Sequence, residues 1–480
     1  MVSNKEMTQE RKVEVRGIDF IPESERNSNP LNVFFAIGGA QLCFPLMLIG
    51  ALPVAFGLGW WDSFWALTIG LIIGSVLVAP IALLGQKTGT NGIVSSGAHF
   101  GIRGRMIGAL LTIFVALGFY ALTVWTGAQS IVYGGNRLFG WSEGNGILAV
   151  GALLITVITS IVATYGHSVV LIIEKAGTWI LGAILILAVF VFLPQFDASY
   201  QGGNYLLGGF WSTWFLSVSI GLSLPISLVP FINDYARYIP TKTSARSIML
   251  GTGGGIFVGC WISMVGASYL MTMFKSMETP FVQGIMEISP VWFIFPLLLV
   301  GLIGSLTQGS FALYGAGLGL ETLGWGLNRI VTTIIISAVA MLLVFLGVFV
   351  YDISNVVNAF VTLIIVAISP WLAIKLVGYY LFKGQYSPLE LQRSEGGIYW
   401  YSNGFNIPAT ASWVVAVIVG LLFTSTSVFV GPFVNLVGGI DVSFISSAIV
   451  SAVLYFIFVK NSLPKEAEVN TIEPSTKKTI

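Results

Sequence analysis

The chain has 480 residues, of which 55% are hydrophobic and only 9% are charged. A soluble domain carries about 25% charged residues, so this composition excludes a soluble protein. The formal net charge of +1 gives no reason to expect nucleic acid or another polyanion as a partner. The apolar residues form long runs rather than alternating with polar ones, which predicts membrane-spanning helices and not the strands of a membrane barrel.

We predict an all-α integral membrane protein with about twelve spans. A polar segment of mixed charge, residues 1–32, comes first and is predicted to be a cytoplasmic tail rather than a signal peptide. Residues 33–460 form the transmembrane domain, with spans 1–10 as its core and spans 11 and 12 as additions, and residues 461–480 form a second cytoplasmic tail. The spans are expected at roughly 33–57, 63–86, 106–135, 145–165, 169–194, 207–233, 247–274, 292–318, 330–350, 354–382, 408–430 and 434–459.

The distribution of positive charge predicts the orientation in the membrane. With the N-terminus inside, the external loops contain only two cationic residues, Arg137 and Lys275. The other Lys and Arg residues fall on the cytoplasmic side or close to it. This bias is typical of multi-pass proteins of a cell membrane, and it places both termini in the cytoplasm.

Two of the predicted spans contain residues that interrupt helices. Span 1 contains the segment 38–45, with the sequence GGAQLCFP, and span 6 contains SLPIS at 223–227, followed by Pro230. Interrupted spans at matching positions of two halves are typical of inverted-repeat transporters, here with spans 1–5 and 6–10 as the halves. Glycine and proline are also common in membrane helices of every kind, so this pairing alone leaves an ordinary helical bundle as the alternative.

Ionisable side chains are scarce within the predicted spans. Glu174 falls near the start of span 5, Asp234 at the cytoplasmic end of span 6, and Lys375 in the inner half of span 10, from where it can extend to the membrane surface. His99 and His167 fall in cytoplasmic loops, where a solvated or capping histidine is expected. Because charges within a membrane are costly and usually functional, their scarcity favours a neutral substrate and argues against a proton relay of Asp, Glu or His.

The sequence gives no sign of a metal centre or an ATPase. Cys43 and Cys260 lie in apolar segments and form neither a CxxC motif nor a cluster with His or carboxylates. The motif G-x-x-x-x-G-K-[ST] is absent. A membrane enzyme would need a nucleophile, a base or a metal in the spans, and a channel gives no reason for paired interrupted helices. We therefore predict a transporter with no enzymatic activity and no cofactor, and keep the enzyme and the channel as rival classes.

Uncharged polar side chains and aromatic rings remain as candidates for a binding site. Amides and hydroxyls read the edge of a planar heterocycle, and aromatic rings stack on its face. For each Ser or Thr the alternative is a hydrogen bond within its own helix or to a neighbouring helix. The polar candidates are Gln41 in span 1, Thr123 and Gln129 in span 3, Ser219, Ser223 and Ser227 in span 6, and Ser305, Thr307, Gln308 and Ser310 in span 8.

Five segments resemble the nucleobase–cation symport family, which includes cytosine, purine and allantoin permeases. They are NPLN at 29–32, FGIRG at 100–104, the turn at 165–175, NDYARYIP at 233–240 and ALYGAGLG at 312–319. Each segment is weak alone, but together they occur in the family's order and spacing over nearly the whole chain. The resemblance implies a LeuT-like fold of five plus five inverted repeats, with spans 1 and 6 broken, that works by alternating access.

The resemblance also implies a substrate site between spans 1, 3, 6 and 8. The stacking aromatic of span 3 falls on Phe119, although Trp125 and Gln129 repeat the family's Trp-to-Gln spacing about two turns later. The stacking aromatic of span 6 falls on Pro225, which cannot sandwich a base and weakens the case for cytosine in particular. The residues expected to bind substrate are Gln41, Phe119, Thr123, Ser223, Ser227 and Gln308.

A coupling-cation site is implied between spans 1 and 8. Its expected residues are Ile37, Ala40, Gly304 and Thr307, but the family's hydroxyl pair falls on Thr307 and Gln308, so one hydroxyl is missing. The coupling ion therefore stays open between proton and sodium. The predicted function is import of a purine or pyrimidine nucleobase such as cytosine by a monomeric symporter. The alternative is a related heterocycle or vitamin such as allantoin, a hydantoin, thiamine or pyridoxine.

Overall fold

Helices make up the whole regular structure of the described chain, which confirms the all-α prediction. The structure is a computed structural model that describes residues 17–165, 167–324, 327, 329–349, 353–426 and 429–459. Its helices are α1 Pro30–Ala40, α2 Phe44–Ala55, α3 Trp60–Val78, α4 Ile81–Thr88, α5 Gly92–Phe100, α6 Met106–Phe139, α7 Asn145–Thr164, α8 His167–Phe192, α9 Phe210–Ser227, α10 Ile232–Ala236, α11 Ala245–Met271, α12 Phe281–Ile288, α13 Val291–Thr322, α14 Arg329–Phe349, α15 Ile353–Leu381, α16 Pro388–Leu391, α17 Ile407–Leu422 and α18 Ser443–Val459.

The described helices account for the predicted spans. Eight helices are long and apolar enough to cross a membrane, one further span is a bent pair of helices, and three shorter apolar helices supply the rest. The prediction missed helices α5 and α12, and it placed the boundary between spans 11 and 12 wrongly. Residues 423–426 and 429–442 lie outside α-helices there, and α18 starts only at Ser443. The Asp441 carboxylate accepts hydrogen bonds from the backbone N–H groups of Ser425 and Ser443.

The two predicted interruptions are present, with one shift in position. Helices α1 and α2 meet at an angle of 65° after a break of three residues. Pro45 lies in the first turn of α2, where its missing N–H would have no partner within the helix. In span 6, helix α9 continues through Pro225 to Ser227, and the gap lies at 228–231 around Pro230. The expected break at 223–227 is therefore wrong, because a single proline is accommodated inside a buried membrane helix.

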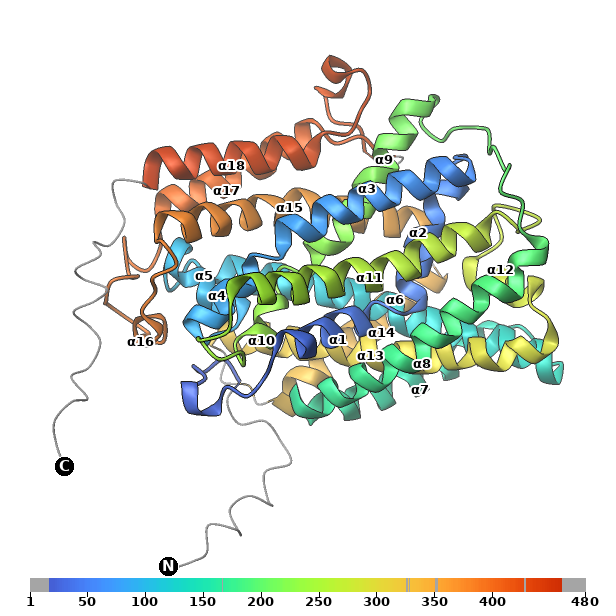
Figure 1. Cartoon of the computed structure of the whole chain (residues 1–480), viewed down its shortest axis with the longest axis horizontal. Helices are drawn as coiled ribbons and strands as arrows, with labels where there is room; N and C mark the ends of the chain where they lie inside the picture. Colours follow the sequence, from blue (N-terminus) through green and yellow to red (C-terminus); the bar gives the residue numbers. More distant parts are fainter. Residues whose placement is uncertain are drawn as a thin grey trace, which may run out of the picture.

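The long helices run side by side, and glycines let some of them approach closely (Figure 1). A Cβ at Gly38 of α1 would lie 2.8 Å from the carbonyl oxygen of Gly255 of α11, and a Cβ at Gly259 would clash with that of Gly38. Small residues of this kind let membrane helices pack backbone to backbone. This contact fixes α1, and with it the break that follows, against α11.

The outer surface of the bundle is apolar, as a lipid-facing surface must be. Large hydrophobic side chains of the peripheral helices are exposed, among them Val150 of α7, Trp179 of α8 and Leu342 of α14. Helices α4, α5, α10 and α16 gather at one end of the bundle, where the described chain also begins and ends (Figure 1). The protein is thus a multi-pass membrane protein with four of its short helices at one end of the bundle, while the short helix α12 lies at the other end.

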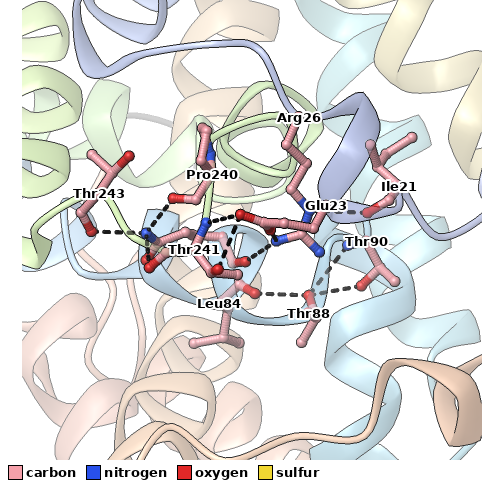
Figure 2. Close-up of polar contacts among 10 residues, drawn as sticks. Ile21, Glu23, Arg26, Leu84, Thr88, Thr90, Pro240, Thr241 and Thr243 are labelled. Carbon is pink, nitrogen blue, oxygen red and sulfur yellow. Dashed lines mark hydrogen bonds and ion pairs between the residues drawn. The ribbon is translucent and has the colours of Figure 1, made fainter. Parts of the chain in front are cut away.

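The segment before α1 packs against this end of the bundle. Ile21 is fully buried, and Arg26 donates hydrogen bonds to the carbonyl oxygens of Ile21 at 2.9 Å and Gln86 at 2.6 Å. Glu23 accepts from the backbone N–H of Thr241 at 2.9 Å, as Figure 2 shows. The Gln86 amide also donates to carbonyls of the loop that follows α10. Residues 21–26 therefore tie the end of α4 to the α10–α11 loop.

The contact between α1 and α11 yields a test of the packing. Gly259→Ala is expected to lower the stability of the protein in detergent by about 1–3 kcal/mol, because the new methyl group meets the backbone of Gly38. Gly266→Ala on the same helix is the matched control, since a Cβ there has no neighbour within 4 Å. A thermal melt in which both variants unfold with the wild type would contradict the close contact.

Candidate functional site

A small cavity lies where the two interrupted spans meet α6 and α13. Ten residues from four parts of the chain line it. The empty space among the lining atoms is about 240 Å³, but the part of it that a water molecule can occupy is only about 10 Å³. That is room for about one water molecule, so the lining is closed tightly around the cavity. The lining residues are Gln41, Val115, Ala116, Phe119, Ser227, Leu228, Phe231, Gln308, Phe311 and Ala312.

Two amide side chains supply most of the polar character of the cavity. Gln41 lies in the break of span 1 and donates from Nε2 to the carbonyl oxygen of Ile37 at 3.0 Å, which holds the side chain in place. Gln308 of α13 is 3% exposed, and its Oε1 has no hydrogen-bond partner among the described residues. An unpaired buried carbonyl oxygen is costly, so Gln308 offers an acceptor that a bound N–H group would satisfy.

Three aromatic rings supply the flat surfaces of the cavity. Phe119 was expected from the sequence, whereas Phe231 and Phe311 were missed. The centroids of these last two rings lie 5.2 Å apart. Phe311 follows Gln308 by three residues on one helix face, so helical spacing was the sequence signal for it. Phe231 lies beside Pro230 in the gap of span 6, so the position of the gap was the signal for it. A Cβ at Gly315 would clash with the Phe231 ring, which shows why that position is glycine.

The remaining residues that were expected to bind substrate lie differently. Ser227 lines the cavity, but its hydroxyl donates to the carbonyl oxygen of Leu224 at 2.6 Å. Thr123 and Ser223 are buried outside the cavity lining, with hydroxyls bonded to carbonyl oxygens of their own helices at 2.7 Å. Pro225 faces α3, where its ring would lie 2.8 Å from a Cβ at Gly74. Gln41, Phe119, Ser227 and Gln308 are thus brought together, and Thr123 and Ser223 are not.

The residues expected to bind a cation lie on facing elements. A Cβ at Gly304 of α13 would lie 3.2 Å from Cys43, so α13 packs directly on the break that follows Ile37 and Ala40. The Thr307 hydroxyl donates to the carbonyl oxygen of Gly304 at 3.0 Å, and a Cβ at Gly177 of α8 would come within 2.5 Å of the Thr307 methyl group. One hydroxyl and several carbonyl oxygens are the available ligands, which suits a small hard cation. No group of three or more His, Cys, Asp or Glu residues is placed to bind a metal in the described chain.

Two expectations about ionisable residues are wrong. Lys375 does not extend to the membrane surface: it is fully buried, its Nζ lies 3.3 Å from the carbonyl oxygen of Gly92, and it sits over the Trp371 ring. His99 is not solvated: it lies in α5 and is fully buried, with Tyr386 and Tyr455 hydroxyls 3.5 and 3.3 Å from its two ring nitrogens. Burial, and to a smaller degree the charge of Lys375, lowers the pKa of His99 to about 3.

The ends of the spans near α10 contain further buried ionisable groups. Glu174 of α8 is fully buried and accepts a hydrogen bond from the Tyr235 hydroxyl at 3.0 Å. Arg237 is also fully buried and donates to the Tyr314 hydroxyl at 3.0 Å and to the carbonyl oxygen of Gly17 at 2.6 Å. The expected scarcity of charge within the spans therefore holds around the cavity but not toward the end of the bundle where α10 lies.

The fold and the cavity between interrupted spans define a secondary transporter with a LeuT-like architecture. Mhp1, a nucleobase-cation-symport-1 family transporter in a closed conformation with bromovinylhydantoin bound, superposes with a TM-score of 0.74 at 19% identity, covering 95% of this chain and 98% of that one. A Na⁺-coupled sialic acid symporter in a substrate-bound outward-open state superposes with a TM-score of 0.61 at 12% identity, covering 94% of each chain.

The family itself follows from the sequence. The family described as permease for cytosine/purines, uracil, thiamine, allantoin matches residues 20–445, and the chain belongs to it. The putative purine-cytosine permease YxlA of Bacillus subtilis is 27% identical over 473 residues, which cover 95% of this chain and 98% of that relative. The predicted family, fold and transport function are thereby confirmed.

The Phe231 ring provides a test of the cavity. Gly315→Ala is expected to displace this ring and to reduce transport severalfold, because overpacking forces a neighbouring side chain to move. Gly317→Ala on the same helix is the control, since its Cβ would meet only the Thr332 hydroxyl at an ordinary 3.6 Å. Initial uptake rates at matched membrane expression compare the two. Equal rates would show that the position of the Phe231 ring does not matter for transport.

Proposed function

We propose that this permease imports a neutral nucleobase-like heterocycle, a purine or a pyrimidine such as cytosine, together with a proton or a sodium ion. The observation that carries the proposal is the composition of the cavity, where the amides of Gln41 and Gln308 lie among the rings of Phe119, Phe231 and Phe311. Amides pair with the N–H and carbonyl groups at the edge of a base, and rings pack on its faces. The proposed substrate residues are these five and Ser227.

The charge of the cavity bears on the choice of substrate. None of its ten lining residues carries an ionisable side chain. Binding a permanently charged molecule there would require an unpaired charge in a dry site, which is costly. Cytosine, uracil, hypoxanthine, allantoin and hydantoins fit this environment as neutral molecules, whereas thiamine carries a fixed positive charge. Pyridoxine remains an alternative because it is a neutral heterocycle near pH 7.

Several further properties belong to the same proposal. The chain is proposed to act as a monomer in the cell membrane. The distribution of Lys and Arg supports a cytoplasmic location for residues 1–32 and 461–480. The proposal includes no catalysis and no cofactor, and the Ser227 hydroxyl of the cavity is bonded to the carbonyl oxygen of Leu224 in its own helix. If sodium is the coupling ion, the carbonyl oxygens of Ile37, Ala40 and Gly304 and the Thr307 hydroxyl are the proposed ligands.

The proposal is tested by uptake of a labelled panel into cells that express the chain. Cytosine, uracil, adenine, hypoxanthine, allantoin, thiamine and pyridoxine are offered with and without sodium, and with a protonophore. We expect saturable accumulation of one or more neutral nucleobases, no uptake of thiamine, and loss of accumulation when the coupling gradient is removed. Accumulation of none of the nucleobases would overturn the substrate assignment, and equilibration without accumulation would overturn symport.

The two amides give a sharper test of the site. Gln308→Ala and Gln41→Ala are each expected to weaken the apparent affinity for substrate by about 5- to 150-fold, since a buried hydrogen-bond partner is worth about 1–3 kcal/mol. Thr123→Val and Ser223→Ala remove hydroxyls that lie outside the cavity lining and are expected to change the affinity by less than about threefold. If the hydroxyl variants lose affinity and the amide variants keep it, the site lies elsewhere along α6 and α9.

A further inference from the structure

The carboxyl group of Glu174 is buried in the transport domain and forms no ion pair with any of the described residues. Glu174 lies seven residues into α8, and its side chain is fully buried. The Tyr235 hydroxyl donates to Oε1 at 3.0 Å, and Oε2 has no hydrogen-bond partner among the described residues. An isolated buried carboxylate is among the most costly groups that a protein interior can contain, whereas the neutral acid is tolerated. This geometry is that of a carboxyl group that holds a proton.

The neighbouring helices contribute few other titratable or charged groups. Helices α1 and α7, which pack against α8, contain no ionisable side chain. Helices α11 and α13 also pack against α8, and their titratable residues are Arg246, Cys260, Tyr269, Tyr314 and Glu321. Lys175 follows Glu174 on the chain and is only half-buried. From α10 come Tyr235 and Asp234, and Asp234 interacts electrostatically with Lys375 of α15. Arg237, at the end of α10, and Tyr314 of α13 hydrogen-bond to each other. Of these groups, Tyr235 alone contacts the Glu174 carboxyl group.

Glu174 is connected to the cavity through one aromatic contact. The Tyr235 ring stacks on Phe311, with centroids 5.5 Å apart and planes 8° from parallel. Phe311 in turn lines the cavity. On its other side Glu174 adjoins the break in span 1, because a Cβ at Gly39 would lie 2.6 Å from the Glu174 carbonyl oxygen. A change at the cavity therefore reaches the carboxyl group through a single ring pair.

We propose that Glu174 is the binding site of the coupling proton, an inference that rests on the proposed symport function and names its ion. The carboxylate takes up one proton from the outer side when the cavity is open outward, forming a neutral acid with no other bond made or broken. In the closed state the acid is shielded and Tyr235 hydrogen-bonds to Oε1. When α10 moves away to open the inner side, that bond breaks, water reaches the carboxyl group, and the proton leaves to the cytoplasm.

The hinge for this movement is present in the chain. Helix α10 has only five residues, and the gap at 228–231 separates it from α9. In transporters of this architecture, interrupted helices form the binding sites, and one repeat moves against the other around them. Tyr235 lies on α10, beyond the gap, and Glu174 lies on the continuous helix α8. The hydrogen bond between them therefore joins segments of the two different halves of the chain.

The test uses the purified full chain in liposomes with a nucleobase that the wild type transports. A pH gradient of one unit, acid outside, can drive at most about tenfold accumulation through a one-proton symporter. We expect the wild type to approach this ratio without sodium and Glu174→Gln to fall to a ratio near one. Exchange of labelled for unlabelled nucleobase should vary with pH in the wild type and become independent of pH in Glu174→Gln.

Two further variants keep the proposal testable if Glu174→Gln does not fold. Tyr235→Phe keeps the carboxyl group and removes its donor, so its pH profile for exchange should shift toward higher pH, because a hydrogen bond to a carboxylate favours the charged form. Glu287→Gln changes an exposed glutamate of α12 and should behave as the wild type. His99 cannot supply the pH response near neutrality, since burial lowers its pKa to about 3.

The contrary outcomes are distinct from one another. If the wild type accumulates nucleobase with a sodium gradient but not with a pH gradient, the proton site is wrong and the symport function stands. The proton site is also wrong if Glu174→Gln still accumulates nucleobase with the pH gradient, or if Tyr235→Phe leaves the pH profile unchanged. If the wild type moves no nucleobase under any gradient, the proposed function itself fails, and the inference fails with it.

Discussion

The hydrogen bonds of the backbone are the constraint on which the rest of this structure depends. In lipid every N–H and C=O group must find a partner within the protein, so each span is a helix and a helix can stop only where other protein surrounds it. The break at 41–43 meets this condition because α13 packs on it at Gly304 and the Ser263 hydroxyl of α11 donates to the carbonyl oxygen of Gln41 at 2.7 Å. The cavity therefore depends on this glycine, because close packing there permits the irregular backbone that lines the cavity.

Within this fold, the chemistry of the cavity depends on which polar atoms have no hydrogen-bond partner in the described chain. The hydroxyls of Ser227, Thr123 and Ser223 donate to carbonyl oxygens of their own helices. To donate to a substrate instead, each would have to break that hydrogen bond. The Oε1 atom of Gln308 has no such partner in the described chain. In the proposed site, most of the driving force for binding would come from burying a planar apolar face, and Gln308 would set the orientation of the substrate, a division typical of small-molecule sites. Selectivity among heterocycles depends on few atoms, which fits a family whose members accept different bases.

The fold could be predicted from the sequence because the membrane thickness dictates the length of each apolar run, and the breaks could be predicted from Gly38, Gly39 and Pro230. Gln41, Phe119, Ser227 and Gln308 could be placed at one cavity because the family resemblance implies that spans 1, 3, 6 and 8 meet there and assigns the aromatic position to Phe119. The place of Phe231 beside Pro230 was a signal, but the direction of its ring could not be predicted, since it depends on the space left by Gly315. The burial of Glu174 also could not be predicted, because a carboxyl group near a span end is buried only through tertiary contacts with α10.

Phe231 and Tyr235 are four residues apart at α10, and both rings contact Phe311. The ring that closes the cavity and the hydroxyl that bonds to Glu174 thus belong to one short segment, and neither can move far without the other. Opening the cavity to the inner side would therefore disturb the Glu174 carboxyl group at the same moment. By linkage, a proton that changes the affinity for substrate by some factor must have its own affinity changed by substrate to the same degree. If Glu174 binds the coupling proton as proposed, the path from the cavity to the proton consists of three side chains, those of Phe311, Tyr235 and Glu174.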